Sequence, residues 1–343
     1  MRGPSRSDEI SLRFSELPLV DVYDGLLIDL DGVIQLDDQP VAGAPQALDR
    51  LRRRAVRIAF VTNNAARSPA DVAARLHHLG VPADVEQIVT SAMAAANLLA
   101  GDLAPGSRVL VVGGTGLVAA ISRAGLTPVS SADDGPVAVV QGWGPDVGWA
   151  ELAEAAVALR SGARWVVTNR DRTLPSPRGP LPGSGALVAA LVTATDREPD
   201  VVVGKPQPGL FTTAATRLGA ERPLMIGDRL DTDIAGAAAA GMPGLLVLTG
   251  VARPLDLLGG RPLERPAYVG RDVTAVETSH PAVSVDGVAA RCGEVVVTAA
   301  GDVNGDPASG DGLDGLRAAC VLAWNGVLPE QAYGQVIRRL NLS

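Results

Sequence analysis

The sequence predicts an α/β protein with a Rossmann-like core, that is, a doubly wound parallel sheet with helices on both faces. Short apolar runs typical of buried strands alternate with longer stretches in which apolar residues recur every three or four positions. Polar and acidic residues directly follow several of the apolar runs. Because parallel α/β sheets bind ligands beyond the carboxyl ends of their strands, these polar residues are the first candidates for a functional site.

The expected elements alternate along most of the chain. The apolar runs expected to form strands are residues 25–28, 56–61, 109–112, 137–140, 165–167, 223–226 and 245–248. The stretches with helical spacing of apolar residues are 44–54, 68–79, 91–99, 116–124, 150–161, 183–194 and 208–218. Residues 128–136 and 169–183 are rich in Pro, Gly, Ser and Asp, so we expect loops there.

The alternation weakens after residue 270, and the end of the chain is expected to form a small α+β unit. Residues 282–299 look like two short β runs around Asp286-Gly287, a dipeptide typical of hairpin turns. A segment dense in Gly and Asp, 301–315, then precedes two expected helices at 316–324 and 329–340.

A chain of 343 residues exceeds the usual size of one domain. Residues 65–204 are far more than one crossover between strands needs, and they contain strands and helices of their own, so a second α/β unit is inserted there. The expected division is an N-terminal arm at 1–19, a core at 20–100 and 195–275, an inserted cap at 101–194 and a C-terminal extension at 276–343.

Composition excludes several classes of function. A net charge of -8 argues against nucleic-acid binding, which needs clustered positive charge to displace counterions. No apolar signal core opens the chain and no apolar run is long enough to span a membrane, so we expect a cytoplasmic protein without a membrane partner. Cys292 and Cys320 are too few for a disulfide framework and are expected in the core, and the three histidines are expected at surface positions.

Acidic residues stand at the ends of two expected strands. The first run leads into Asp29 and Asp31, one residue apart, and a later run leads into Asp228, with Asp233 in the following turn. Acidic groups at neighbouring strand ends need a cation to coexist. Mg²⁺ suits such a site, because it is held by one or two carboxylates together with water and phosphate oxygens.

Two further segments are suited to an anion. Thr62, Asn63 and Asn64 follow a strand and offer a hydroxyl, side-chain amides and main-chain N–H groups, although an ordinary turn explains this tripeptide when it is taken alone. Lys205 also follows an apolar run, and it is the only lysine in the sequence. Its compact ammonium suits a point charge against a phosphate in a crowded pocket. By contrast, Gly113-Gly114-Thr115-Gly116 lacks the full spacing of a dinucleotide loop and is expected to be a plain strand-to-helix turn.

Together and in this order, four segments resemble the haloacid dehalogenase (HAD) superfamily of phosphohydrolases. The matching segments are Asp29-Leu30-Asp31-Gly32, Thr62-Asn63-Asn64, Lys205, and Asp228 with Asp233. The resemblance implies a HAD-type phosphatase in which Asp29 attacks phosphorus and forms an aspartyl-phosphate. Asp31 would protonate the leaving alcohol and later deprotonate the attacking water.

The same resemblance implies roles for the remaining polar residues. The residues expected to bind the phosphoryl group are Thr62, Asn63, Asn64 and Lys205. Mg²⁺ would be held by Asp29, the Asp31 carbonyl and Asp228, while Asp233 would orient Lys205 or a metal-bound water.

The position of the inserted unit is similar to that of the large cap in HAD subclass IIA, whose members dephosphorylate small metabolites. Segments that support this resemblance include Thr168-Asn169-Arg170-Asp171 and Val203-Gly204-Lys205-Pro206. The cap residues expected to contact the leaving group are Asn169, Arg170, Asp171 and Arg172. The alternative for Asn169 and Asp171 is that they only stabilise a loop.

Subclass IIA enzymes usually end soon after the segment matched here by residues 268–273. A phosphatase with a further extension resembles the actinobacterial glycerol 3-phosphate phosphatases, whose extension is a shortened acetyltransferase-like region. The expected reaction is therefore hydrolysis of glycerol 3-phosphate, with phosphoglycolate, pyridoxal phosphate, nucleotides and 4-nitrophenyl phosphate as alternative substrates. The extension is expected either to form a homodimer or to buttress the core.

Two readings without phosphatase activity stay open. A signalling receiver also uses paired acids, a phosphorylated aspartate, a hydroxyl residue and a lysine, but it needs no inserted cap. A metabolite-binding protein on the same fold would not need every catalytic segment to be intact. The inserted unit and the Asp-x-Asp-Gly segment favour the enzyme.

Overall fold

The structure is a computed structural model, and it describes residues 12–36, 39–174 and 178–342. Two compact units are present. Unit 1 comprises the described residues up to Ile58 together with those from Gly219 onward, and unit 2 comprises Ala59–Leu218. The expected division into arm, core, cap and extension cuts the chain at other positions and stays a prediction, and residues 1–11 of the expected arm lie outside the described residues.

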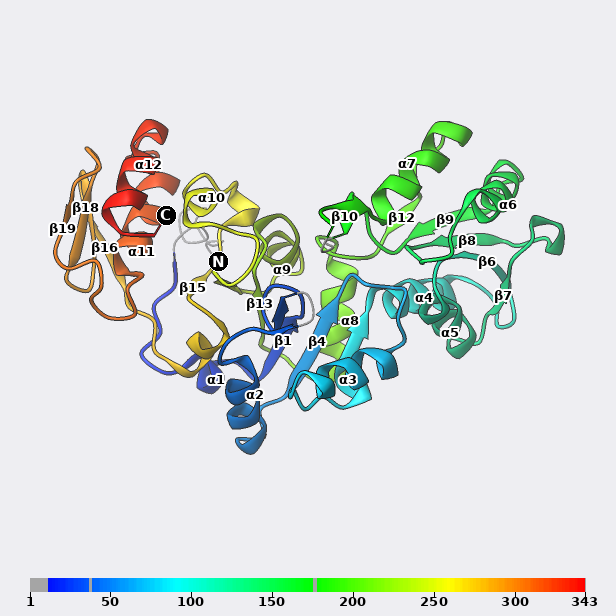
Figure 1. The fold of residues 1–343 in the computed structure, drawn as a ribbon, viewed down its shortest axis with the longest axis horizontal. Helices are drawn as coiled ribbons and strands as arrows, with labels where there is room; N and C mark the ends of the chain where they lie inside the picture. Colours follow the sequence, from blue (N-terminus) through cyan, green and yellow to red (C-terminus); the bar gives the residue numbers. More distant parts are fainter. Residues whose placement is uncertain (1–11, 37–38, 175–177, 343) are drawn as a thin grey trace, which may run out of the picture. The chain divides into compact units, whose positions relative to one another are not determined.

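A parallel sheet with the strand order β15-β14-β13-β1 lies at the centre of unit 1 (Figure 1). The bounds of its strands are β1 (Gly25–Asp29), β13 (Pro223–Gly227), β14 (Gly244–Val247) and β15 (Tyr268–Gly270). Every residue of these four strands is buried, as is typical of parallel strands covered on both faces. Ile28 pairs with Ile226, so β1 and β13 end side by side at the same edge of the sheet.

Short helices and turns complete this part of unit 1. They are α1 (Leu19–Val22), α2 (Ala44–Arg53), α9 (Ala235–Ala239), α10 (Pro254–Leu258), the π-helical turn η3 (Leu230–Ile234) and the 3₁₀ turns η4 (Pro262–Glu264) and η5 (Val273–Glu277). Strand β2 (Gln35–Leu36) pairs with β3 (Gln39–Pro40) in an antiparallel arrangement.

The C-terminal part of unit 1 is an antiparallel sheet with two helices. Its sheet has the order β16-β17-β18-β19, with bounds β16 (Val283–Asp286), β17 (Ala289–Cys292), β18 (Val295–Thr298) and β19 (Val303–Asn304). The helices are α11 (Asp314–Trp324) and α12 (Glu330–Arg339). The expected hairpin is confirmed, because Asp286 pairs with Ala289, but two more strands extend the expected pair.

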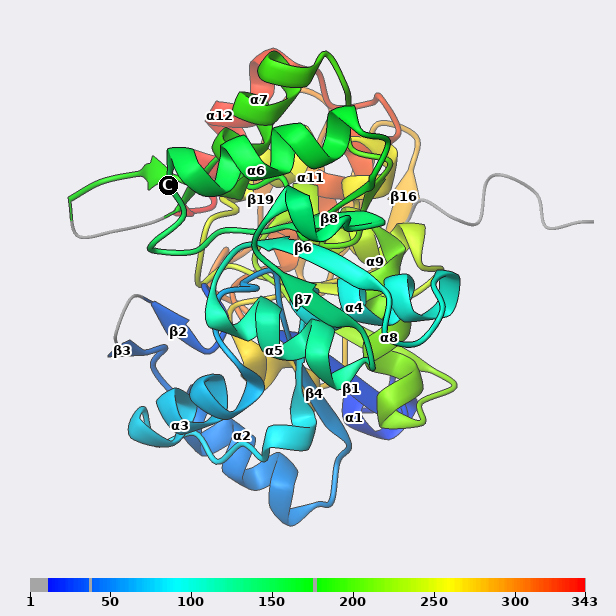
Figure 2. The same cartoon turned by 90° about the vertical axis from the view of Figure 1, so that its right-hand side faces the viewer.

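Unit 2 contains a second parallel sheet, with the order β12-β9-β8-β6-β7. Its strands are β6 (Arg108–Val112), β7 (Thr127–Val129), β8 (Ala138–Gln141), β9 (Arg164–Val167) and β12 (Val201–Val202). Figure 2 shows α6 (Trp149–Arg160) and α7 (Ser184–Thr195) on one face of this sheet and α5 (Thr115–Arg123) on the other. The apolar face under α6 and α7 packs around the fully buried Trp165.

The rest of unit 2 contains the parallel pair β4 (Ile58–Thr62) and β5 (Ile88–Thr90). Around it lie α3 (Pro69–His78), the 3₁₀ turn η1 (Val85–Gln87), α4 (Ser91–Asp102) and α8 (Pro208–Leu218). Ser68 caps α3 by accepting the Asp71 N–H, and Pro69 occupies the first helical position.

Several short elements fall where loops were expected. In the segment 169–183, β10 (Thr173–Leu174) pairs with β11 (Leu181–Pro182), whereas residues 175–177 lie outside the described residues. The segment 128–136 contains the end of β7 and the 3₁₀ turn η2 (Ala132–Asp134). Strands of two or three residues are too short to show a period of two in the sequence, which explains these differences.

The glycine-rich turn after β6 is a packing contact within unit 2. A Cβ on Gly114 would lie 2.8 Å from the Ala66 carbonyl oxygen, and one on Gly116 would lie 2.4 Å from the Arg67 carbonyl oxygen. The Gly116 N–H also donates to the Ala66 carbonyl at 2.9 Å. These glycines therefore bring α5 against the 66–67 main chain, in agreement with the expected plain turn.

The cysteines and one histidine are core residues. Cys292 and Cys320 are fully buried, as expected, and burial raises the pKa of the Cys292 thiol to about 12. The surface position expected for His280 is wrong, because its side chain is 3% exposed. Its ring packs edge-on against Tyr268, with ring centroids 4.9 Å apart, and its Nε2 lies 3.0 Å from the Ala275 carbonyl oxygen.

Among the described residues, no helix combines the length and apolar character that a membrane span requires.

Candidate active site

Three buried carboxylates gather at the carboxyl edge of the unit 1 sheet. Asp29 is the last residue of β1, Asp228 directly follows β13, and Asp233 lies in the turn η3. Each offers an oxygen atom, and these three atoms lie within 4.8 Å of one another. Asp29 is 6% exposed, and the other two are fully buried. Buried carboxylates this close favour a bound divalent cation, so the expected gathering of these acids is present.

The loop after β14 surrounds the Asp228 carboxylate. The Val251 N–H donates to Asp228 Oδ2 at 2.7 Å, and the Ala252 N–H donates to the Asp228 main-chain carbonyl at 3.0 Å. A Cβ on Gly250 would lie 2.0 Å from Asp228 Oδ2, and one on Gly32 would lie 2.3 Å from the same atom. Glycine is thus required on both sides of this carboxylate.

Asp233 is held in a similar way by its own turn. The Arg229 N–H donates to Asp233 Oδ2 at 3.1 Å. A Cβ on Gly227 would lie 2.2 Å from the Asp233 Cβ, so only glycine fits at the end of β13. This close contact places Asp233 against the end of β13, which Asp228 directly follows.

Asp31 has a different environment from Asp29, since it is exposed whereas Asp29 is buried. Gln35 Nε2 donates to Asp31 Oδ1 at 2.8 Å, and the Gln35 carbonyl accepts the Gly32 N–H at 2.7 Å. Thr249 Oγ1 donates to the Gly32 carbonyl at 2.5 Å. Gln35 and Thr249 were not among the expected site residues, because no local pattern marks a side chain whose partner is in another segment.

In unit 2, the segment after β4 forms a tight polar turn. Thr62 is 3% exposed, and its Oγ1 accepts the Asn64 N–H at 3.1 Å. Asn64 Oδ1 accepts the Ala66 N–H at 2.9 Å, as in an Asx turn. The side chains of Thr62 and Asn64 therefore shape the turn that carries the Asn63 and Asn64 N–H groups.

Asn63 binds the main chain of Lys205. Its Oδ1 accepts the Lys205 N–H at 2.8 Å, and its Nδ2 donates to the Lys205 carbonyl at 3.2 Å and to Asp171 Oδ2 at 3.1 Å. The Asn63 carbonyl accepts from Asn169 Nδ2 at 2.8 Å and from Ser91 Oγ at 2.6 Å. We call these contacts of Asn63 with Lys205, Asp171, Asn169 and Ser91 the Asn63 network.

The Asn63 network also requires a glycine beside the lysine. A Cβ on Gly204 would lie 2.2 Å from the Thr168 carbonyl oxygen and 2.6 Å from Asn63 Oδ1. Lys205 itself is 6% exposed. The expected lysine is thus buried within unit 2, next to Asn63.

The four expected cap residues have different surroundings. Asn169 is buried and Asp171 half-buried, and both belong to the Asn63 network, as in the alternative in which they stabilise a loop. Arg170 forms an ion pair with Glu198. Arg172 is exposed, and its carbonyl accepts the Gly183 N–H at 2.9 Å. Contact of these residues with a substrate stays a prediction.

Comparison with known proteins gives the family. A model for haloacid dehalogenase-like hydrolases matches residues 26–127, and a second model of HAD-like hydrolases matches residues 202–276. A curated D-glycerol 3-phosphate phosphatase of Mycobacterium tuberculosis is 48% identical over 307 residues, which cover 88% of this chain and 86% of that protein. The chain belongs to the haloacid dehalogenase-like hydrolases. As expected from the sequence, this HAD-like hydrolase is a HAD-type phosphatase.

Solved structures support the same family and fold. A crystal structure of a glycerol phosphate phosphatase from Mycobacterium tuberculosis in complex with magnesium has a TM-score of 0.83 and 42% identity, covering 96% of this HAD-like hydrolase and 100% of that chain. A thermostable NPPase double mutant from Geobacillus stearothermophilus has a TM-score of 0.66 and 35% identity, covering 73% and 96% of the two chains. The expected Rossmann-like α/β fold is confirmed.

Proposed function

We propose that this HAD-type phosphatase hydrolyses glycerol 3-phosphate to glycerol and phosphate with Mg²⁺ as its cofactor. The observation that carries the metal-dependent chemistry is the cluster of Asp29, Asp228 and Asp233. The substrate is supported by the similarity to the mycobacterial D-glycerol 3-phosphate phosphatase over most of both chains. Other small phosphomonoesters, namely phosphoglycolate, pyridoxal phosphate, nucleotides and 4-nitrophenyl phosphate, are the alternatives.

The acidic cluster fits a magnesium ion. Mg²⁺ prefers oxygen ligands and is commonly bound by one or two carboxylates, which Asp29 and Asp228 would supply together with the Asp31 main-chain carbonyl. Asp233 would support the site without binding the ion directly, since its Oδ2 accepts the Arg229 N–H. When bound, the ion neutralises negative charge that develops on the phosphoryl oxygens.

Asp29 and Asp31 would divide the chemistry between them. Asp29 Oδ attacks phosphorus, the bond to the alcohol oxygen breaks, and Asp31 gives that oxygen a proton. Asp31 then removes a proton from a water molecule, which attacks the phosphorus of the aspartyl-phosphate and frees Asp29. The exposed position of Asp31, fixed by Gln35, suits a group that must reach both an alcohol and a water.

The segment after β4 and Lys205 would bind the phosphoryl oxygens. We assign Thr62, the Asn63 N–H group and the Lys205 ammonium to this task, whereas Asn64 would support the turn, because its N–H donates to Thr62 Oγ1. The Asn63 amide would act indirectly, because its oxygen and nitrogen are used to hold the Lys205 main chain. Among the cap residues, Arg172 is the best candidate for contact with the leaving group, because Asn169, Arg170 and Asp171 bind other side chains or main chain.

The chain would be organised as a core at 20–100 and 195–275, a cap at 101–194 and an extension at 276–343. It would assemble as a homodimer, which analytical ultracentrifugation would test. A cytoplasmic location is included because both cysteines are unpaired, as is usual in a reducing compartment.

Phosphate release from glycerol 3-phosphate and from the four alternative substrates, with and without Mg²⁺, tests the proposal. We expect glycerol 3-phosphate to give the highest kcat/KM, and both Mg²⁺ removal and Asp29→Asn to abolish turnover. Turnover that survives in Asp29→Asn would overturn the mechanism. A preference for another ester would retain the mechanism and reject the substrate.

A further inference from the structure

Helix α11 lies in the centre of the C-terminal part of unit 1, and all of its residues are buried. Figure 1 shows it between strands β16–β19 and the region of α10. Arg317 and Trp324 are seven residues apart, so they lie on the same side of the helix. Arg317 Nη2 donates to the Val269 carbonyl at 2.8 Å, and Trp324 Nε1 donates to the Leu257 carbonyl at 3.0 Å. Two polar side chains of α11 are therefore bonded to main chain outside the extension.

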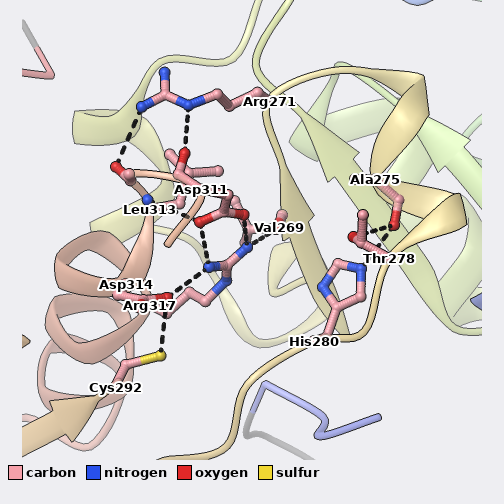
Figure 3. Close-up of polar contacts among 11 residues, drawn as sticks. Val269, Arg271, Ala275, Thr278, His280, Cys292, Asp311, Leu313, Asp314 and Arg317 are labelled. Carbon is pink, nitrogen blue, oxygen red and sulfur yellow. Dashed lines mark hydrogen bonds and ion pairs between the residues drawn. The ribbon is translucent and has the colours of Figure 1, made fainter. Parts of the chain in front are cut away.

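The contact of Arg317 fixes α11 against strand β15. As Figure 3 shows, its guanidinium binds the Asp311 carboxylate at 2.7 and 2.5 Å, Asp314 at 2.9 Å, and the Val269 carbonyl. Burial opposes the charge of Arg317, but the bonds and ion pairs to Asp311 and Asp314 outweigh it and raise the arginine pKa. A buried arginine with all these partners is a fixed attachment point, because losing any of them would leave a charge unpaired.

The contact of Trp324 fixes α10. Leu257 is near the end of α10, and its carbonyl accepts the Gly260 N–H at 3.2 Å as well as the indole N–H. Arg265 Cζ lies over the Trp324 ring, 5.7 Å from its centroid. Ala252, Leu257 and Leu258 share one apolar core with residues of α11. The position of α10 is thus set by α11.

The segment before α10 is the loop that surrounds Asp228. Val251 donates its N–H to Asp228 Oδ2, Ala252 belongs to the apolar core shared with α11, and α10 begins at Pro254. Because the Val251 N–H is bonded to Asp228 Oδ2 and Gly250 packs against the same atom, a displacement of this loop would change the contacts of the Asp228 carboxylate. We propose that Trp324 is a positioning residue for the metal site, acting through α10 and the 249–252 loop.

This inference rests on the proposed binding of Mg²⁺ by Asp228. Its test is Trp324→Phe in the full-length chain, which keeps an aromatic ring but removes the N–H donor. Replacing groups that orient metal ligands directly costs about 10- to 100-fold in metal affinity, so for this more remote contact we expect the Mg²⁺ dissociation constant to rise about 3- to 10-fold. Isothermal titration calorimetry with Mg²⁺ alone measures this constant without turnover.

Two control variants separate positioning from general loosening. Trp149→Phe changes an indole that is 83% exposed in unit 2 and should leave Mg²⁺ affinity unchanged. Val297→Ala removes methyl groups of β18, a strand of the extension's own sheet, and should lower the melting temperature without changing Mg²⁺ affinity. A milder variant, Arg265→Gln, leaves Trp324 in place and should weaken Mg²⁺ binding in the same direction but less.

Each outcome decides between the two proposals. If the wild-type chain binds Mg²⁺ and Trp324→Phe binds it with equal affinity, the positioning role is overturned and the proposed metal site is retained. An equal loss of affinity in Trp324→Phe and Val297→Ala would also overturn it, because the effect would follow stability alone. Absence of Mg²⁺ binding by the wild-type chain would overturn the proposed metal site and, with it, this inference.

Discussion

Asn63 shows how a single residue joins two segments of unit 2. Its amide forms hydrogen bonds to both polar main-chain groups of Lys205 and to the Asp171 carboxylate. Because these bonds occupy the Asn63 side chain, its main-chain N–H is the group left to bind an anion. The tripeptide Thr62-Asn63-Asn64 marks the region in the sequence, but the division of labour within it depends on Lys205 and Asp171, far along the chain.

Replacing Asn63 should therefore reduce catalysis by displacing Lys205. Misplacing a catalytic group by about 1 Å can cost on the order of 100-fold in rate, and we expect Asn63→Ala to lower kcat/KM by a similar factor. Asn63→Asp should be at least as damaging, because a carboxylate would face Asp171 and the Lys205 carbonyl.

The matched comparison is Asp171→Asn, which can still accept a hydrogen bond from Asn63 Nδ2 and should keep most activity. Asn304→Ala, at an exposed position of unit 1, serves as the surface control. Steady-state kinetics with the preferred substrate provide the readout, and an Asn63→Ala variant with wild-type kcat/KM would show that Lys205 needs no such support.

His280 gives stability a dependence on pH. Burial is the main cause of its lowered pKa, and the nearby Arg317 acts in the same direction, whereas the hydrogen bond to the Ala275 carbonyl and the Asp311 carboxylate oppose it. The unfolded chain takes up a proton near the ordinary pKa of about 6.5, while the folded chain takes it up only at lower pH. The free energy of unfolding should therefore fall as pH drops below this value.

Urea unfolding at pH 7.5, 6.5 and 5.5 measures this effect. The slope can approach about 1.4 kcal/mol per pH unit for one proton, and His280→Gln should reduce it over this range. Burial raises the pKa of Asp311, but the hydrogen bonds and charge of Arg317 outweigh this effect and lower it. Asp311 therefore also reduces the free energy of unfolding as pH falls, but only at more acidic pH. Identical slopes in wild type and His280→Gln would exclude the histidine as the cause.

The acidic site residues were predictable from the sequence, whereas the groups that hold them were not. Asp29 and Asp228 stand directly at the ends of apolar strands, a local signal that needs no knowledge of contacts. Gln35, Gly250 and Thr249 matter through contacts with other segments, which a pattern along the chain does not encode.

At the scale of elements, glycines set how closely helices approach other segments. Gly114 and Gly116 bring the start of α5 against residues 66–67, directly after the turn formed by Thr62 and Asn64. The position of α5 in unit 2 is thereby linked to the segment proposed to bind phosphate.

Gly116→Ala should therefore destabilise unit 2. Its Cβ would lie 2.4 Å from the Arg67 carbonyl, and overpacking of this kind costs about 1–3 kcal/mol. The control is Gly101→Ala in α4, where a Cβ meets no atom within 4 Å and should be neutral or stabilising, because alanine favours helices. Thermal unfolding of both variants distinguishes them, and equal melting temperatures would refute the packing role.

The long elements followed from periodicity, and the short ones did not. All seven expected helices of the α/β part are present within a few residues of their predicted bounds, because each shows an apolar face at helical spacing. The strands β5, β7 and β15 have three residues each and were not predicted individually, whereas β12 was expected as the apolar run before Lys205. Such strands are defined by their partners, as when Leu245 pairs with Tyr268 in β15.

At the scale of the whole molecule, the C-terminal part is not an appendage of unit 1. Leu246, Leu257 and Val269 share one apolar core with residues of β17, β18, α11 and α12. The HAD-like family match ends at residue 276, so this shared core lies partly outside the segment common to the family. The expected buttressing of the core by the extension agrees with this packing.

Removing residues 281–343 should consequently prevent stable folding. Burying a large apolar side chain contributes about 1.5–3 kcal/mol, and the loss of many such contacts exceeds the usual net stability of about 5–15 kcal/mol. We expect the truncated chain to aggregate or to bind a hydrophobic dye, whereas Val288→Asp, at a side chain 67% exposed on the extension, should remain folded. A soluble, cooperatively unfolding truncated chain would contradict this expectation.

Lys205 carries the only side-chain amine in the sequence, and it is buried beside the Asn63 network. Reagents that acylate amines therefore have one side-chain target in this sequence, Lys205. A lysine-containing reference peptide in the same reaction reports reagent strength, so the ratio of the labelled Lys205 peptide to this reference in a mass spectrum reports access to Lys205. Phosphate or a substrate analogue that lowers this ratio would reveal occupancy of the proposed anion site in the unaltered protein.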